Sequence, residues 1–318
     1  MSETRTDAAA RLTATATATA TATGPVPALE ARGLTLAYDR SVVFEGLDLR
    51  IEAGTVTTLI GANGSGKSTL LKAFGRILQP SAGTVRLDGQ PVREFATREV
   101  ARRLAILPQK PLTPSATSVR DLVSRGRHPH QSMLKPWTPR DTEVVDAALA
   151  ATGLAELAGR DAGSLSGGQL QRAWIALVLA QEAPTILLDE PTTFLDLSHQ
   201  LDVLELVRSI NRERGATVVM VLHDLSLAGR YSDRLVVVGG GRVLADGAPW
   251  EVLTPDILRS AFDLEALVVP DPSSGSPLVV PALRPESTSD FRWPSANRPD
   301  ARGLSTAETA GEVDGTRG

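Results

Sequence analysis

The first residues whose types and spacing could do chemistry are the eight of Gly61–Ser68, GANGSGKS. The spacing is that of a phosphate-binding loop, in which glycines let backbone N–H groups point at phosphate oxygens and a helix N-terminus adds partial positive charge. We expect Lys67 to reach the outer phosphates of a nucleoside triphosphate and Ser68 to ligate Mg²⁺. A glycine-rich turn without a ligand is the disfavoured alternative. The residues predicted to contact the nucleotide are Gly61, Ala62, Asn63, Gly64, Ser65, Gly66, Lys67, Ser68 and Thr69.

Two adjacent carboxylates follow a run of apolar residues in ILLDEP, residues 186–191. Charged groups at the end of a buried strand are costly unless they are paired or functional. We therefore expect Asp189 to hold Mg²⁺, directly or through water. We expect Glu190 to polarise a water for attack on the terminal phosphate. A solvated acidic pair is the alternative, which the phosphate-binding loop makes less favoured.

Two further strand ends carry single polar side chains. Gln109 follows an apolar run in LPQK, and its neutral amide can ligate Mg²⁺ or orient water without adding charge. His223 ends the apolar run VLH, after the Asp-Glu strand, where a sensor of the terminal phosphate is needed. An ordinary loop glutamine and a structural histidine are the alternatives. We predict catalytic roles for both residues beside Glu190.

A second glycine pair lies in SLSGGQLQR, residues 164–172. Its composition also suits contact between backbone and phosphate. The chain already has a phosphate-binding loop about a hundred positions earlier. The sequence therefore raises the question of what a second phosphate-binding motif is for.

Composition narrows the function classes. The chain has 318 residues, of which 42% are hydrophobic, enough for a sizeable core. The net charge of −4 gives no global sign of nucleic-acid binding. The absence of cysteine excludes disulfides, thiol catalysis and cysteine-ligated zinc. No stretch is apolar and long enough to span a bilayer, and residues 1–24 lack the apolar region of a secretory signal. We expect a cytoplasmic chain whose membrane partner, if any, is another subunit.

The elements that must position these residues alternate between strands and helices. We expect buried strands at 55–60 and 185–191, a strand and turn at 84–92, and a strand that ends in a loop at 103–109. Further strands are expected within 216–224 and 234–247, a helix at 67–78 and several helical stretches within 118–162. This pattern predicts an α/β fold with a helical insert. The Thr-Ala repeat predicts that 1–27 is a low-complexity, disordered segment. In 285–318 Pro, Ser, Thr, Gly, Asp and Arg dominate without apolar periodicity, which predicts a disordered C-terminal tail. The predicted folded body is 28–284, with a helical subdomain at about 110–172.

Taken in order, GANGSGKS, LPQK, LSGGQ, ILLDEP, FLDL and VLHD form the motif set of ATP-binding cassette proteins. The chain resembles the nucleotide-binding subunit of an ABC transporter over about residues 28–284. The resemblance implies a P-loop NTPase cassette with a RecA-like parallel-sheet core, an antiparallel β subdomain and a helical subdomain that carries the signature motif. It also implies ATP and Mg²⁺ as cofactors.

The resemblance assigns roles to further positions. Tyr38 matches the aromatic that stacks on adenine, although a half-buried strand tyrosine is the alternative. Asp196 matches the loop that couples two ATP sites across a dimer. The signature residues, in the family, close on the ATP held by a partner's phosphate-binding loop, which would explain the second glycine pair. They are Ser166, Gly167, Gly168 and Gln169.

Finer details resemble the importer ATPases for iron–siderophore complexes, haem and cobalamin. The similar segments are 119–131, 171–181, 189–200 and 271–281. His128 and His130 in GRHPHQ are too few ligands to favour a metal site. The segment follows the Gln109 loop, where the family contacts its membrane subunit, so the resemblance implies a docking surface there. Leu170 departs from the subgroup, which often has a basic residue after the signature glutamine.

The expected assembly is a homodimer of cassettes at the cytoplasmic face of the membrane. Its partners would be a membrane permease and, indirectly, an extracytoplasmic substrate-binding protein, with no nucleic acid. The predicted function is ATP hydrolysis that drives import, with iron–siderophore complexes as the favoured cargo. Another cargo (cobalamin, haem or a metal ion), export, a soluble ABC ATPase outside transport and a non-hydrolysing module are the alternatives.

Overall fold

The computed structural model describes residues 26–38, 41–111, 116–132, 136–193 and 195–282. The predicted terminal segments 1–27 and 285–318 lie outside these residues, except for residues 26 and 27. The described residues up to Pro281 form one compact unit. Among the described residues, no helix has the length and apolar character needed to cross a membrane.

The core is a six-stranded sheet in the order β10-β9-β3-β8-β7-β6. Its first five strands along the chain pair in parallel, and β10 joins the edge antiparallel. The strands β3, β7 and β8 are buried at every position, as expected of parallel strands covered on both faces. The bounds are β3 Val56–Ile60, β6 Leu104–Leu107, β7 Thr185–Asp189, β8 Thr217–Val221, β9 Arg234–Gly239 and β10 Arg242–Gly247.

An antiparallel sheet in the order β2-β1-β4-β5 packs against one face of the core sheet, with helix α1 (Lys67–Phe74) in the same apolar cluster. Its strands are β1 Leu29–Tyr38, β2 Ser41–Ile51, β4 Ala82–Leu87 and β5 Gln90–Pro91. A 3₁₀ turn, Val92–Glu94, and α2, Thr97–Arg103, lead back to β6.

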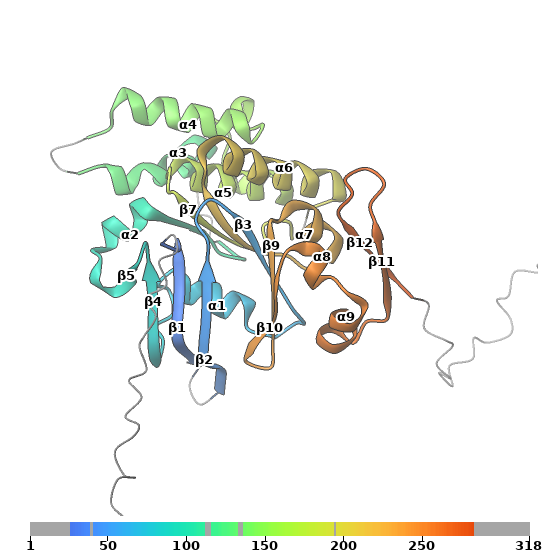
Figure 1. Ribbon diagram of the computed structural model, residues 1–318. Helices are drawn as coiled ribbons and strands as arrows, with labels where there is room; N and C mark the ends of the chain where they lie inside the picture. The colour runs from blue at the N-terminus through green and yellow to red at the C-terminus, as the bar shows by residue number, and fades with distance from the viewer. Residues whose placement is uncertain (1–25, 39–40, 112–115, 133–135, 194, 283–318) are drawn as a thin grey trace, which may run out of the picture. The chain divides into compact units, whose positions relative to one another are not determined.

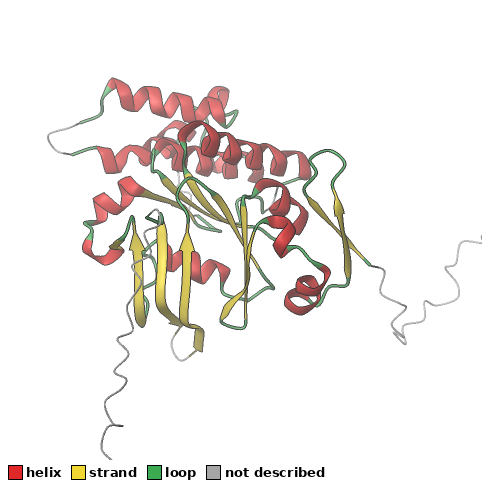
Figure 2. Ribbon diagram, in the orientation of Figure 1, coloured by secondary structure: helices red, strands yellow, loops and turns green. Residues whose placement is uncertain are grey.

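Helices cover the opposite face of the core sheet (Figures 1 and 2). The insert supplies α3 Val119–Ser124, a 3₁₀ helix η2 Arg125–His130, α4 Pro139–Ala151, η3 Ala155–Leu157, η4 Ala162–Ser164 and α5 Gly167–Ala180. Helices α6 Leu197–Arg214 and α7 Leu225–Tyr231 follow β7 and β8. The chain then forms α8 Pro249–Val252, α9 Pro255–Phe262 and the hairpin β11 Ala266–Pro270 with β12 Pro277–Pro281.

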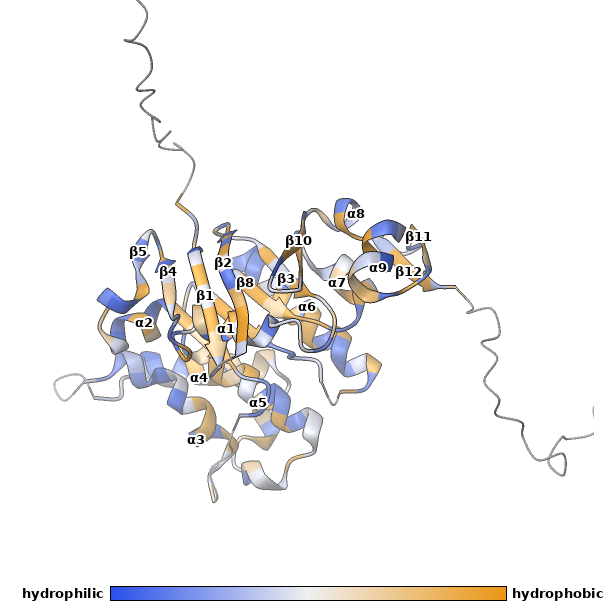
Figure 3. Cartoon of the chain, turned by 90° about the horizontal axis from the view of Figure 1, so that it is seen from below, coloured by the Kyte–Doolittle hydropathy of each residue, from blue (hydrophilic) through white to orange (hydrophobic). Residues whose placement is uncertain are grey.

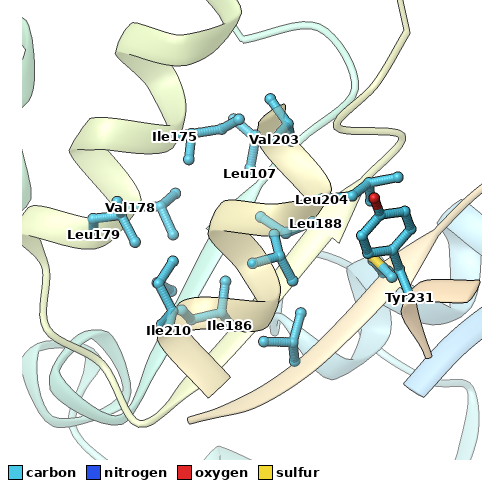
Figure 4. Packing of buried hydrophobic residues seen from close by; sticks show 14 of the residues in the cluster. Leu107, Ile175, Val178, Leu179, Ile186, Leu188, Val203, Leu204, Ile210 and Tyr231 are labelled. Carbon is cyan, nitrogen blue, oxygen red and sulfur yellow. The ribbon is translucent and has the colours of Figure 1, made fainter. Parts of the chain in front are cut away.

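Two apolar clusters, one on each face of the core sheet, hold these layers together. Successive strand residues alternate between them: Ile186 and Leu188 pack with α5 and α6, whereas Leu187 packs with α1 and the antiparallel sheet. Figure 4 shows the first cluster, where Val178 of α5 and Val203 of α6 lie close to these strand residues. In Figure 3 the strands are largely hydrophobic in colour, and hydrophilic colour gathers on the outer helices. The clusters fix the strand ends on which the site is built.

Candidate nucleotide-hydrolysis site

The phosphate-binding loop connects β3 to α1, as its motif predicts. Gly61 has φ 153°, and a Cβ on it would lie 2.2 Å from the carbonyl oxygen of Val238. Gly66 has φ 97°, and a Cβ there would lie 2.5 Å from the ring of Phe44. These two positions require glycine for both backbone conformation and close packing. The loop is therefore held in one curled shape between the two sheets.

The Lys67 ammonium lies over the same loop. Its Nζ donates to the carbonyl oxygens of Gly61, at 2.9 Å, and Ala62, at 3.0 Å. The residue is 5% exposed, and burial lowers its pKa while the nearby Glu190 and Asp189 carboxylates oppose that change. The buried hydroxyl of Ser65 has no hydrogen-bond partner among the described residues. The buried Lys67 ammonium and the unsatisfied Ser65 hydroxyl both lie at the curled loop. Such a set of groups suits the binding of nucleotide phosphates.

Ser68 and Asp189 meet across the loop. The Ser68 hydroxyl donates to Asp189 Oδ1 at 2.8 Å, although the two residues are 121 positions apart. Asp189 is 2% exposed, and burial raises the pKa of its carboxyl, with the Ser68 hydrogen bond opposing and the Glu190 charge adding to the rise. No cluster of three or more His, Cys, Asp or Glu side chains with metal-binding geometry occurs in the described part of the chain. A hydroxyl and a carboxylate beside a phosphate site suit Mg²⁺, which usually takes few protein ligands together with substrate phosphates.

Glu190 lies at the centre of the predicted catalytic residues. Its Oε2 accepts from Gln109 Nε2 at 2.7 Å and from Thr193 Oγ1 at 3.0 Å, and its Oε1 lies 2.8 Å from His223 Nε2. Burial acts to raise the pKa of Glu190. The hydrogen bonds from His223, Gln109 and Thr193 outweigh it and hold this pKa below its usual value. The site therefore keeps a charged carboxylate, as a group that activates water requires.

These contacts bring together residues from three strand ends. Gln109 follows β6, Glu190 follows β7 and His223 follows β8, and these strands are adjacent and parallel. Thr193 is the one member of the cluster that motif matching missed. The sequence signal for Thr193 is its spacing, since a hydroxyl three residues after a carboxylate can hydrogen-bond to that carboxylate within a turn. In the structure this turn is closed by the hydrogen bond from Thr193 N to Glu190 O, at 3.2 Å.

The signature residues form the start of α5. Ser166 is the N-cap, and its hydroxyl accepts from Gln169 N at 3.3 Å while Gln169 Oε1 accepts from Ser166 N at 3.1 Å. Gly167 is exposed and Gly168 is half-buried. Among the described residues, no hydrogen bond joins this segment to Gly61–Thr69. The hydrogen bonds of the Ser166 and Gln169 side chains are therefore local to the start of α5.

Tyr38 and Asp196 lie apart from the Glu190 cluster in the contacts that the structure gives. Tyr38 ends β1 and is 44% exposed. Asp196 caps α6, with Oδ1 accepting from His199 N at 3.0 Å and lying 2.6 Å from His199 Nδ1. The backbone hydrogen bond of His199, its ring and Ser198 lower the pKa of Asp196. Both side chains are open to a ligand or a partner from outside this chain.

The segment that holds His128 and His130 has a structural role that the sequence did not indicate. His130 Nε2 lies 2.8 Å from the carbonyl oxygen of Gln181. Arg127, only 4% exposed, pairs with Asp141 and Glu182, at 2.8 Å each. The segment therefore ties η2 and α4 to the C-terminal end of α5 within the helical insert.

Comparison with known proteins gives a consistent result. A family model described as ABC transporter matches residues 44–193. The chain is 47% identical over 254 residues to the petrobactin import ATP-binding protein FpuD of Bacillus anthracis, covering 80% of this chain and 93% of that protein. It is 47% identical over 259 residues to the ferric enterobactin transport ATP-binding protein FepC of Escherichia coli, with coverage of 81% and 96%.

A solved structure shares the fold. The dimeric structure of a bacterial ABC transporter cassette, MJ0796, aligns with a TM-score of 0.63 and 25% sequence identity. The alignment covers 70% of this chain and 98% of that one. The expected α/β cassette with its additional antiparallel sheet and helical insert is confirmed.

Proposed function

The chain belongs to the ATP-binding subunits of ABC transporters, and on this premise we propose that it powers import of an iron–siderophore complex through a separate membrane permease. As a member of this family it binds ATP and is an ATPase. One observation carries the proposal for its own residues. Three adjacent strand ends converge on the Glu190 carboxylate, and the neighbouring Asp189 contacts the phosphate-binding loop through Ser68.

The phosphate-binding loop, Gly61–Ser68, is the first part of the proposed ATP site. The backbone N–H groups of the loop and Lys67 would bind the phosphates. The buried Ser65 hydroxyl, which has no hydrogen-bond partner in the part of the chain that the structure describes, would serve the same purpose. Ser68 and Asp189 would hold Mg²⁺, with Gln109 as a further ligand; when bound, the ion neutralises developing charge on the phosphates. Tyr38, at the end of β1, would stack on the adenine.

The proposed chemistry uses Glu190 as the group that orients and activates the attacking water. Its lowered pKa keeps it charged, so that it accepts a hydrogen bond from the water. His223, 2.8 Å from Glu190 Oε1, positions the carboxylate and would sense the terminal phosphate. Phosphoryl transfer needs positioning and charge neutralisation more than covalent chemistry. The residues of this site can supply both.

The exposed Ser166 and Gly167, which make no hydrogen bond to the phosphate-binding loop among the described residues, support a homodimer. Each signature segment, Ser166–Gln169, would close on the ATP held by the partner's loop, with Asp196 coupling the two sites. The dimeric cassette structure with the same fold supports this arrangement. The dimer would lie at the cytoplasmic face of the membrane, bound to a permease that receives cargo from an extracytoplasmic binding protein.

The proposed cargo follows from the relatives alone. Two proteins at 47% identity are named for import of petrobactin and transport of ferric enterobactin. Cargo does not touch the ATPase in this scheme, so no side chain of this chain selects it. Cobalamin, haem or a metal ion are the other cargoes that the test must separate.

The test is an uptake assay in a strain that lacks this gene. Cells are given radioactive iron bound to petrobactin or to enterobactin, and, in parallel, radioactive cobalamin, haem and free metal ions. We expect iron–siderophore uptake to fall in the deletion strain and to return with the wild-type gene. Uptake that falls only for cobalamin, haem or a free metal ion would overturn the proposed cargo.

The matched variant for this test is Glu190→Gln, which keeps the size of the side chain and removes its charge. We expect the purified variant to bind ATP and to hydrolyse it about 10²–10⁴-fold more slowly, the usual contribution of a positioned base. The variant should not restore uptake. Normal hydrolysis by Glu190→Gln would remove Glu190 from its proposed role.

A further inference from the structure

The Glu190 carboxylate is almost enclosed, and its orientation depends on three donors. Its side chain is 11% exposed, whereas that of His223 is 47% exposed. His223 lies against Oε1, and Gln109 and Thr193 both donate to Oε2. A buried carboxylate that loses a donor cannot recover the bond easily from bulk water. Each of the three donors therefore affects where the carboxylate points.

Thr193 differs from the other two donors in where it comes from. Gln109 and His223 follow β6 and β8, which are separate strands. Thr193 lies on the turn that Glu190 itself begins, closed by the hydrogen bond from Thr193 N to Glu190 O at 3.2 Å. The Thr193 hydroxyl is thus held beside the carboxylate by the turn itself and not by the packing of a neighbouring strand.

The backbone of this turn supports the same conclusion. Glu190 has φ 54°, in the left-handed region that residues with a Cβ rarely adopt. Such conformations persist where surrounding contacts fix them, and they cluster at functional sites. The side-chain bond from Thr193 and the turn bond both close over this strained residue. They hold the chain in the one shape that directs Glu190 toward Gln109 and His223.

We propose that Thr193 is a positioning residue for ATP hydrolysis, whose hydroxyl holds the Glu190 carboxylate in the orientation that activates water. The inference rests on the proposed role of Glu190. The inference does not require Thr193 to contact the nucleotide. The adjacent Thr192 is a natural control, because the structure gives its hydroxyl no hydrogen bond to Glu190.

The experiment compares Thr193→Val, Thr193→Ser and Thr192→Val in the full-length chain. Valine keeps the shape of threonine and removes the hydroxyl, and serine keeps the hydroxyl. We expect Thr193→Val to lower kcat about tenfold or more, since a hydrogen bond to a charged group is lost. The dissociation constant for ATP and the thermal unfolding temperature should stay near the wild-type values. Thr193→Ser should recover most of kcat, and Thr192→Val should retain it.

The outcomes separate this inference from the proposed function. If Thr193→Val matches wild type in kcat while Glu190→Gln is inactive, Thr193 has no positioning role and the proposed function stands. If Thr193→Ser is as slow as Thr193→Val, shape matters instead of the hydroxyl, and the inference is again overturned. If Glu190→Gln hydrolyses ATP normally, the proposed role of Glu190 is wrong, and the inference about Thr193 is wrong with it. A loss of ATP affinity equal to the loss of kcat would also contradict positioning.

Discussion

At the scale of single residues, the site is governed by how each charge is compensated. Lys67 is buried against two carbonyl oxygens, Asp189 against a hydroxyl and Glu190 against three donors. The pKa values of the two carboxyls move in opposite directions: burial raises that of Asp189, and the hydrogen bonds of Glu190 lower its own. The two neighbouring carboxyls therefore lie in different environments, in which burial favours the neutral form of Asp189 and hydrogen bonds favour the charged form of Glu190.

The first residue-scale prediction concerns Lys67. Lys67→Ala removes the only ammonium that reaches into the loop among the contacts described for Gly61–Thr69. We expect ATP affinity, measured by isothermal titration calorimetry, to fall below detection because the terminal phosphates lose their positive partner. Arg98→Ala, at an exposed position on α2, is the control and should bind ATP normally. Retained affinity in Lys67→Ala would exclude Lys67 from the site.

At the scale of elements, the helical insert is fastened by a buried ion pair. Arg127 in η2 binds Asp141 in α4 at 2.8 Å and also donates to Ala180 O, at 2.8 Å, at the end of α5. Asp141 is also the third residue of α4 and accepts from Thr138 N at 2.9 Å, which caps the helix. One carboxylate therefore stabilises both a helix start and the contact between three elements.

This pair gives a prediction on stability. Burial acts to raise the pKa of Asp141, but the hydrogen bonds of Arg127 and Thr138 outweigh it and lower the pKa to about 2. Asp141→Asn leaves the buried Arg127 with Glu182 as its remaining carboxylate partner. The free energy of unfolding at neutral pH should therefore fall by about 2 kcal/mol, less than the loss of a sole buried partner would cost. Urea denaturation measures the change. Asp146→Asn, in the exposed pair with Arg120, is the control and should cost less than about 1 kcal/mol.

The pH dependence of that difference follows from the sign of the shift. Because the pKa of Asp141 is lower in the folded state, its contribution is complete above its ordinary value of 3.8. The contribution is lost as the pH falls from there through about 2. The stability gap between wild type and Asp141→Asn should therefore be constant near neutral pH and shrink in acid. A gap that does not change down to about pH 2 would show that charge at Asp141 is not its source.

Elements also show what the sequence could and could not predict. Apolar runs such as 185–191 predict buried parallel strands, and adjacency of parallel strand ends explains why Gln109, Glu190 and His223 meet. The helix predicted to reach residue 78 ends at Phe74, because Gly75 leaves the helical path there. Arg127 and Asp141 meet across 14 residues through packing, which no local pattern encodes. Motif matching also passes over Thr193, whose role depends on the turn geometry of Glu190.

At the scale of the whole molecule, the chain has two glycine motifs, Gly61–Ser68 and Ser166–Gln169, with no hydrogen bond between them among the described residues. The exposed start of α5, with its N-cap and two glycines, has the properties of an anion-binding helix terminus. A side-chain bond from Gln171 Nε2 to Pro191 O, at 3.0 Å, links α5 to the turn after Glu190 in the same chain. If a partner's ATP binds at the start of α5, this hydrogen bond connects the helix that contacts it to the turn after Glu190 in the same chain.

The corresponding prediction is complementation between two inactive variants. Ser166→Asp keeps a good N-cap for α5 and places a negative charge against the partner's phosphate, and Lys67→Ala disables the loop. Each homodimer should be inactive. A mixed dimer has one site broken twice and one intact, so mixing should restore about a quarter of wild-type ATPase activity if the sites act independently.

A second measurement covers the case in which turnover needs both sites. Both variants are prepared with Glu190→Gln added, and the mixture is tested for ATP retained after gel filtration. An intact composite site holds one ATP per mixed dimer even when hydrolysis is blocked, because binding requires only one loop and one facing signature segment. Activity and retained ATP that are both absent from a mixture that still dimerises would contradict a signature motif acting on the partner's nucleotide. Retained ATP without activity would instead mean that the two sites hydrolyse only together, with Asp196 at the start of α6 as the residue placed to couple them.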